Sequence, residues 1–244
     1  MLSQSISGLI AADYLLFIYC CHIGSQSKSK ISKFWIVKSS DEVLEKVASV
    51  NARNVAISVG SIDFSTLYTS IVHESLVREL KWVVRKAFKD SSKRRIAVYK
   101  ERAQWVDKPK ESTKSVGEEE LIEMIKYLIG STAFEYGGVV WSQWIGIPMG
   151  TDCAPYLANL YLFALEYKWI ARMEEGRRKE PDRVRGKEEA IEEWKEEDRK
   201  VRLGEVKRLR TVSRYIDDGL VVNGIDIVMK YIEEIYRHDS EKRE

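Results

Sequence analysis

The chain has 244 residues, of which 44% are hydrophobic and 10% aromatic, so it can bury a core and is not disordered throughout. Its 40 Lys and Arg against 38 Asp and Glu leave a net charge of +2, so any contact with nucleic acid must depend on local patches. The longest apolar run, residues 15–21, is far shorter than the ~20 residues of a membrane-spanning helix, and we expect no membrane partner.

The first half of the chain predicts a strand followed by an amphipathic helix. Val55, Ile57 and Val59 alternate with small or polar residues, which predicts a half-buried strand that runs towards Asp63. Residues 73–88 have helical periodicity, with one apolar stripe made of Leu76, Leu80, Val83, Val84, Ala87 and Phe88.

A basic stripe lies on another face of the predicted helix 73–88 and consists of Arg78, Lys81, Arg85 and Lys89. It belongs to a segment, residues 74–110, with 12 Lys and Arg against five Asp and Glu. Two interpretations stay open at this point. The stripe is either a solvated helix surface or a track for the phosphates of a nucleic-acid backbone.

The second half alternates between helices and short strands. Polar residues from Ser112 to Gly117 predict a loop. We expect short strands over Leu209–Tyr215 and Leu220–Val222, on either side of Asp217 and Asp218. The periodicity and capping residues predict helices over 118–129, 156–173 and 227–236.

Residues 171–210 are unusually rich in charge, with 14 Lys and Arg and 12 Asp and Glu. Within this segment, residues 188–202 predict an exposed helix with charge pairs one turn apart. The segment is either a solvated insertion or a helix that binds another protein.

Three clusters carry residues suited to phosphoryl-transfer chemistry. Asp63 follows the predicted strand, Gly146 to Pro155 form a tight loop before an apolar helix, and Asp217 and Asp218 lie where a hairpin would turn. Mg²⁺ prefers oxygen ligands and is usually held by one or two carboxylates together with substrate phosphates. Each cluster alone is ordinary, since a lone Asp or an Asp-Asp-Gly is usually a turn. Their joint occurrence in this order indicates a two-metal site.

The three clusters together resemble the motifs of reverse transcriptases. Residues 61–69, with the run DFSTLYT, are similar to motif A; residues 143–160, with GIPMGT and CAP, to motif B; and residues 214–220, with RYIDD, to motif C. The combination is most similar to Penelope-like retroelements, whose reverse transcriptase is related to telomerase. The resemblance extends over about residues 34–236 and includes the region that precedes motif A.

The resemblance implies a role for each matched residue. Asp63, Asp217 and Asp218 are the expected catalytic carboxylates, which hold two Mg²⁺ ions (or Mn²⁺) together with the carbonyl oxygen of Phe64. Tyr68, Gln143, Met149 and Gly150 are expected to surround the incoming dNTP, with Tyr68 against the position of a 2′-hydroxyl. Tyr215 is expected beside the primer end. Some of Arg78, Lys81 and Arg85 are expected to contact the RNA template and DNA primer.

The resemblance also implies an α+β polymerase palm over residues 34–244, with an antiparallel sheet, helices packed on one face, partial fingers and no thumb. Residues 1–33 are unassigned, and residues 171–210 would be an insertion. Because Glu244 lies 26 residues beyond Asp218, we expect a truncated fragment of an RNA-directed DNA polymerase. The alternatives are an inactive retroelement remnant and an interaction protein that acts through the charged segment 171–210. The family's way of life suggests a nuclear location.

Overall fold

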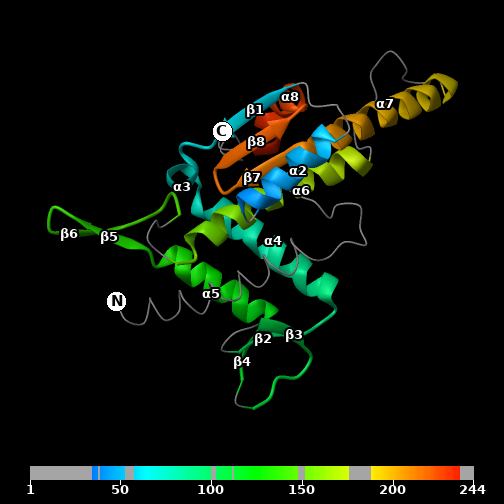
Figure 1. Ribbon diagram of the computed structural model, residues 1–244. Helices are drawn as coiled ribbons and strands as arrows, with labels where there is room; N and C mark the ends of the chain where they lie inside the picture. Colours follow the sequence, from blue (N-terminus) through cyan, green and yellow to red (C-terminus); the bar gives the residue numbers. More distant parts are fainter. Residues whose placement is uncertain are drawn as a thin grey trace. The chain divides into compact units, whose positions relative to one another are not determined.

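The computed structural model describes residues 35–37, 39–52, 58–99, 103–111, 113–147, 152–175 and 188–236. The expectations for residues 1–33, Val55, Ile57, Met149 and Gly150 lie outside these ranges. Within them the fold is α+β, as predicted, with helices and small antiparallel sheets (Figure 1). The described part divides into two compact units: unit 1 is Phe64–Ala164, and unit 2 combines Phe34–Asp63 with Leu165–Arg237.

Unit 1 is built around two helices that pack against each other, α4 (His73–Ser91) and α5 (Glu118–Gly130). The predicted apolar stripe of α4 is buried in full, and α5 adds Leu121, Ile122, Ile125 and Ile129 to the same core. The remaining elements of unit 1 are α3 (Leu67–Ser70), β2 (Arg95–Val98), β3 (Ala103–Val106), β4 (Lys114–Gly117), β5 (Ala133–Tyr136), β6 (Val139–Ser142) and the first half of α6 (Ala154–Glu175).

Strand β4 corrects one expectation, because the polar run 112–117 was predicted to be a loop. Strands β3, β2 and β4 form an antiparallel sheet in that order, with Ile96 opposite Val116. Both of these side chains are buried, whereas Lys114 is exposed. The sequence gives little signal here because one apolar residue in a four-residue strand produces no visible alternation.

Strands β5 and β6 form a hairpin of their own that extends away from α5 (Figure 1). All eight of its strand residues are exposed. Its two-residue loop is Gly137–Gly138, and both glycines have positive φ, at 63° and 76°. This is the loop type for which glycine is the preferred residue at both positions.

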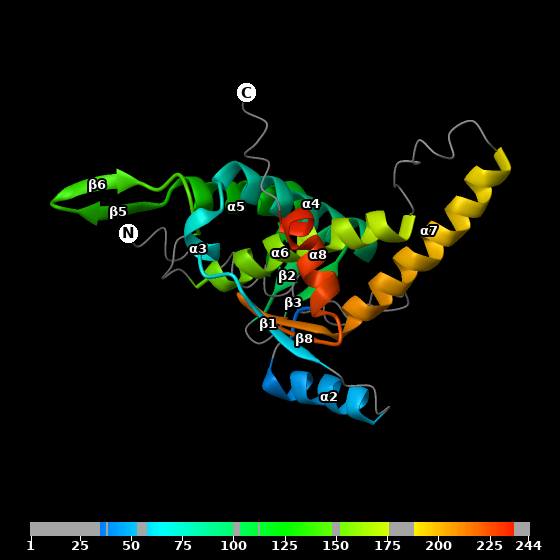
Figure 2. The ribbon, with the colours of Figure 1, turned by 90° about the horizontal axis from the view of Figure 1, so that it is seen from above.

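Unit 2 contains a three-stranded antiparallel sheet in the order β1 (Val59–Asp63), β8 (Asp218–Val222) and β7 (Val212–Tyr215). Figure 2 shows α8 (Ile225–Tyr236) on one face of this sheet and α2 (Ser40–Asn51) on the other, so the expectation that helices pack on one face only was wrong. The second half of α6 and α7 (Glu188–Arg208) complete the unit.

The sheet corrects two details of the prediction. Val59 was expected to face inwards, but it is 68% exposed. The packed face of β1 instead carries Gly60, where an added Cβ would lie 2.7 Å from the side chain of Ile225 in α8. The second correction concerns Leu209–Thr211, which form a 3-10 turn, so that strand β7 begins at Val212 rather than at Leu209.

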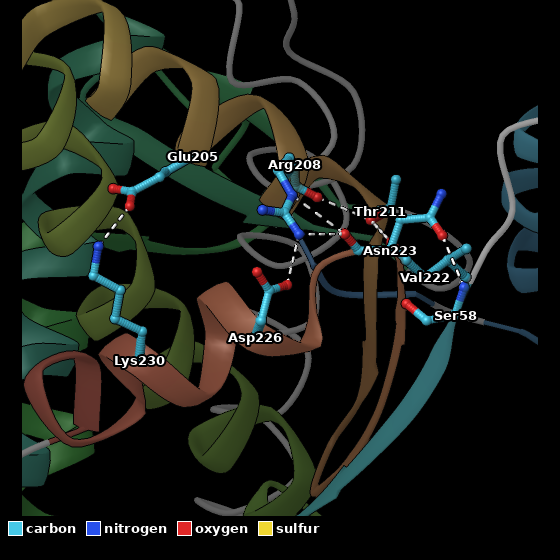
Figure 3. Close-up of polar contacts among 8 residues, drawn as sticks. All are labelled: Ser58, Glu205, Arg208, Thr211, Val222, Asn223, Asp226 and Lys230. Atoms are coloured by element: carbon cyan, nitrogen blue, oxygen red, sulfur yellow. Dashed lines mark hydrogen bonds and ion pairs between the residues drawn. The ribbon is translucent and has the colours of Figure 1, made fainter. Parts of the chain in front are cut away.

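A group of polar contacts fixes the end of the sheet where β8 leads into α8 (Figure 3). Arg208 donates to the carbonyl oxygen of Asn223 at 3.0 Å and to Asp226 at 2.6 Å. The hydroxyl of Thr211 donates to the carbonyl of Val222, and the amide of Ser58 donates to the side chain of Asn223. These contacts connect the ends of β1, β7 and β8 at one end of the sheet.

Helix α7 confirms the charged helix predicted for residues 188–202. Along its length Lys195 pairs with Glu192, Arg199 and Lys200 pair with Glu196, and Arg202 pairs with Asp198. Its last turns are packed, because Arg202, Glu205 and Val206 are buried. None of the helices in the described ranges has the length and apolar composition needed to cross a membrane.

Candidate active site

Two of the predicted catalytic carboxylates lie side by side in unit 2. Asp63, the last residue of β1, is directly opposite Asp218, the first residue of β8. Tyr215, the last residue of β7, is opposite Asp218 on the other side. Residues directly opposite each other in antiparallel strands project from the same face of the sheet. The predicted adjacency of Asp63 and the Asp217-Asp218 hairpin is therefore present.

Asp217 lies at the tip of the β7–β8 hairpin. The loop has two residues, Ile216 and Asp217, between the paired residues Tyr215 and Asp218. Ile216 has a φ of 55°, a conformation that β-branched side chains rarely adopt. Such outliers cost of order 1–3 kcal/mol and persist where the surroundings impose them. The hairpin thus carries backbone strain next to its carboxylates.

The three carboxylates have no compensating partner among the described residues, where none of them makes a hydrogen bond or an ion pair. Asp63 and Asp218 are exposed and Asp217 is partly exposed. Like charges directly opposite each other destabilise a sheet. A purely structural explanation for the Asp63–Asp218 pair is therefore weak, and a bound cation would remove the repulsion.

The donor set fits Mg²⁺ in its chemistry, since it consists of carboxylate oxygens at the exposed end of two neighbouring strands. The described residues do not, however, contain a cluster of three or more acidic, His or Cys side chains that could hold a metal on their own. Two carboxylates together with substrate phosphates are sufficient for Mg²⁺ in many enzymes. The carbonyl of Phe64, the expected further oxygen donor, accepts a hydrogen bond from the amide of Leu67 at 2.9 Å.

A buried ion pair lies on the other face of strand β7 and was not predicted. The Arg214 and Glu166 side chains are 1% and 0% exposed, with Arg214 Nε 2.6 Å and Nη2 3.2 Å from the two carboxylate oxygens. The hydroxyl of Tyr236 donates to Glu166 Oε1 at 2.9 Å. Burial raises the pKa of Glu166, while the Arg214 guanidinium acts in the opposite direction. A single Glu within the apolar run of α6 was the available signal for this pair.

In unit 1 the motif B loop contacts the second half of motif A. The amide of Ile147 donates to the carbonyl of Tyr68 at 2.7 Å, and the amide of Gly146 donates to Ile71 at 2.7 Å. Gly146 has a φ of 92°, and a Cβ there would lie 2.6 Å from the Tyr68 carbonyl oxygen. Glycine is therefore required at position 146. His73 Nε2 lies 2.8 Å from the carbonyl oxygen of the same glycine.

The predicted nucleotide-binding residues Tyr68 and Gln143 are both half-buried in unit 1. The Gln143 side-chain amide donates to the carbonyl of Ile145 at 3.0 Å, within its own loop. Asp63, Asp217, Asp218 and Tyr215 belong to unit 2. The structure thus brings together the carboxylates in one unit and the motif A and motif B turns in the other.

The predicted basic contacts of α4 have partners of their own. Arg78 donates to Glu79 and to the hydroxyl of Ser75, each at 3.0 Å. Arg85 lies 3.6 Å and 3.2 Å from carboxylate oxygens of Glu118 and Glu119 at the start of α5. Lys81 is half-buried. Part of the positive charge counted in the sequence is therefore compensated within unit 1.

Comparisons with known proteins give one finding about the fold. The structure is similar to that of apo telomerase from Candida tropicalis truncated from its C-terminal domain, with a TM-score of 0.50 and 11% sequence identity. The match covers 97% of this chain and 38% of the telomerase chain, so the chain spans less than half of that protein. No protein-family model and no curated protein matches the sequence. The likeness shows a telomerase-like fold.

Proposed function

We propose that the chain is the core of an RNA-directed DNA polymerase of the Penelope-like type, with a palm formed around the sheet of unit 2. The observation that carries the proposal is the pairing of Asp63 with Asp218 beside a hairpin tip that bears Asp217. Three motifs in family order supply these residues. The fold likeness to telomerase supports the same class, because the family that the motifs resemble is related to telomerase.

In this proposal the carboxylates of Asp63 and Asp217 hold two Mg²⁺ ions, with Asp218 and the carbonyl of Phe64 as further oxygen donors. The bound ions supply Lewis-acid activation of the primer 3′-hydroxyl and neutralise charge on the leaving pyrophosphate. The protein otherwise positions its substrates, which is the main contribution of proteins to phosphoryl transfer.

The other motif residues then position the primer and the dNTP. Tyr68 excludes a 2′-hydroxyl and so favours DNA synthesis. Gln143, Met149 and Gly150 support the nucleotide and the template base, and Tyr215 lies on the carboxylate face beside the primer end. Some of the basic residues Arg78, Lys81 and Arg85 of α4 contact the backbones of the RNA template and DNA primer. Residues 34–244 form the catalytic domain, and residues 171–210 are an insertion in it.

The test is primer extension on poly(rA)·oligo(dT) with Mg²⁺, comparing the natural chain with Asp217→Asn. Removing one charge-stabilising group from an active site typically lowers turnover by about 10²–10³-fold, and we expect at least that loss. Asp41→Asn is the matched control, because Asp41 is an exposed aspartate in α2 of the same unit. Extension that survives Asp217→Asn, or that neither protein performs, would refute the proposal for this chain.

A further inference from the structure

The Arg214–Glu166 pair is connected to the loop that carries Asp217. Besides its two bonds to Glu166, the Arg214 guanidinium donates from Nη1 to the carbonyl oxygen of Ile216 at 2.8 Å. Ile216 is the first residue of the two-residue loop and has a φ of 55°. The arginine therefore contacts the strained residue that precedes Asp217.

The backbone of Arg214 is held on both sides. On one side Arg214 pairs with Gly219 in strand β8. On the other side its amide donates to Trp35 at 2.5 Å, and its carbonyl accepts from Val37 at 2.9 Å. Helix α6 supplies Glu166, which binds the guanidinium, and α8 supplies Tyr236, which donates to Glu166, so two further elements fix the position of the guanidinium.

Arg214 does not share a face of the sheet with the carboxylates. Tyr215, Asp218 and Asp63 are paired and project from one face, and Arg214, next to Tyr215 in β7, projects from the other. The guanidinium therefore acts on Asp217 through the backbone of the loop. It is a positioning residue rather than a metal ligand.

We propose that Arg214 and Glu166 form a buried clamp that holds the Ile216–Asp217 loop in its strained conformation and so positions Asp217 for metal binding. The proposal rests on the proposed polymerase function. The left-handed conformation of an isoleucine requires an external support, and the hydrogen bond from Arg214 to the carbonyl of the same residue is that support. A charged donor gives a stronger hydrogen bond than a neutral one.

The first experiment follows the loop directly and does not require activity. Hydrogen exchange of the segment 212–222 is measured by mass spectrometry in the full chain and in Arg214→Lys, which keeps the charge but loses the planar set of donors. We expect at least tenfold faster exchange of the hairpin amides in the variant. Glu166→Gln should also speed exchange of the hairpin amides, and it replaces Arg214→Lys in the test if that variant fails to fold.

The matched control is Arg202→Lys. Arg202 is also a buried arginine of unit 2, paired with Asp198 at 2.5 Å and donating to the carbonyl of Met173. These two partners, Met173 and Asp198, lie on α6 and α7 rather than on the hairpin. We expect Arg202→Lys to leave exchange of the segment 212–222 unchanged. If it opens the hairpin as much as Arg214→Lys does, or if Arg214→Lys does not open it, the clamp is refuted.

The second experiment measures primer extension by the same variants under conditions in which circular dichroism shows each to be folded. A small misplacement of a catalytic group can lower turnover about 10²-fold. We therefore expect a loss of that size in kcat for Arg214→Lys, with KM for dNTP within about threefold.

Ile216→Gly provides the rescue, because glycine adopts a positive φ without strain. We expect the double variant Arg214→Lys with Ile216→Gly to be at least tenfold more active than Arg214→Lys alone. In the natural chain, Ile216→Gly should raise activity by less than twofold. Absence of rescue would contradict the clamp. A natural chain that extends no primer would refute the polymerase function, and the exchange experiment would then still decide on the clamp.

Discussion

The hairpins β5–β6 and β7–β8 have the same loop length but hold their loops in different ways. In β5–β6 the loop is Gly137–Gly138, whose positive φ values cost glycine little, and the strands are exposed throughout. In β7–β8 the loop is Ile216–Asp217, and the positive φ falls on a β-branched residue. The first loop follows from its own sequence, whereas the second depends on contacts with other elements.

Under the proposed function, the loop that needs external support is the one that carries a catalytic carboxylate. A loop whose residues match its conformation needs no support and can extend into solvent. The Ile216–Asp217 loop has residues that disfavour its conformation, and it keeps that conformation because Arg214, Glu166 and strand β8 hold it in place. Local conflicts of this kind are expected at functional sites. The conflict in β7–β8 coincides with the three carboxylates, and the β5–β6 loop has neither feature.

The largest expected effect follows from removing the support of β7–β8. Arg214→Met leaves the Glu166 carboxylate buried without its cation, which typically costs about 3–5 kcal/mol of unfolding free energy. In the exposed hairpin, Phe134 lies opposite Trp141 and is 52% exposed, so Phe134→Ala should cost less than about 1 kcal/mol. Urea denaturation of both variants measures the contrast, and equal losses would remove the distinction between the hairpins.

The same variant should respond to pH in a defined direction. Burial already raises the pKa of Glu166 in the natural chain, and loss of Arg214 removes the influence that opposes this. A carboxyl group whose folded-state pKa is raised favours the folded state at low pH, and this contribution is lost as pH rises through the folded-state value. The loss of unfolding free energy caused by Arg214→Met should therefore be smaller at pH 5 than at pH 8. A deficit that does not change with pH would show that Glu166 is solvated in the variant.

A change in stability of intermediate size is expected for substitutions in the loop of the β5–β6 hairpin. Gly138→Ala places a Cβ at a φ of 76°, where open space surrounds it but the backbone is strained, and should cost about 1 kcal/mol. Gly130→Ala is the matched control, because Gly130 also has open space around it but lies in helix α5. Gly130 is the last residue of α5, and alanine there should raise stability by up to about 0.5 kcal/mol. Effects of the same sign would mean that φ does not decide the outcome.

The sequence predicts those parts of the molecule that depend on local pattern. Helix α4 was predicted within three residues because its apolar stripe repeats at helical spacing, and the adjacency of Asp63 and Asp218 followed from motifs in a known order. The strand over 114–117, the outward direction of Val59 and the Arg214–Glu166 pair were missed. Each depends on a partner that is distant along the chain, which local periodicity does not encode. The roles of the carboxylates and the identity of the metal remain predictions.

The smallest expected effect concerns the two carboxylates that face each other across β1 and β8. Asp218→Asn removes the repulsion with Asp63 and should raise stability by about 0.5 kcal/mol in the presence of a chelator. Because both charges are exposed at the ends of their strands and are screened by salt, the gain should largely disappear at 1 M NaCl. The equivalent closing pair of β5–β6, Tyr136 with Val139, is uncharged and offers no such gain. Thermal unfolding at low and high salt measures the difference. A gain that persists at 1 M salt would mean that Asp218 is destabilising for a reason other than its charge, and the case for a cation between the strands would lose its electrostatic basis.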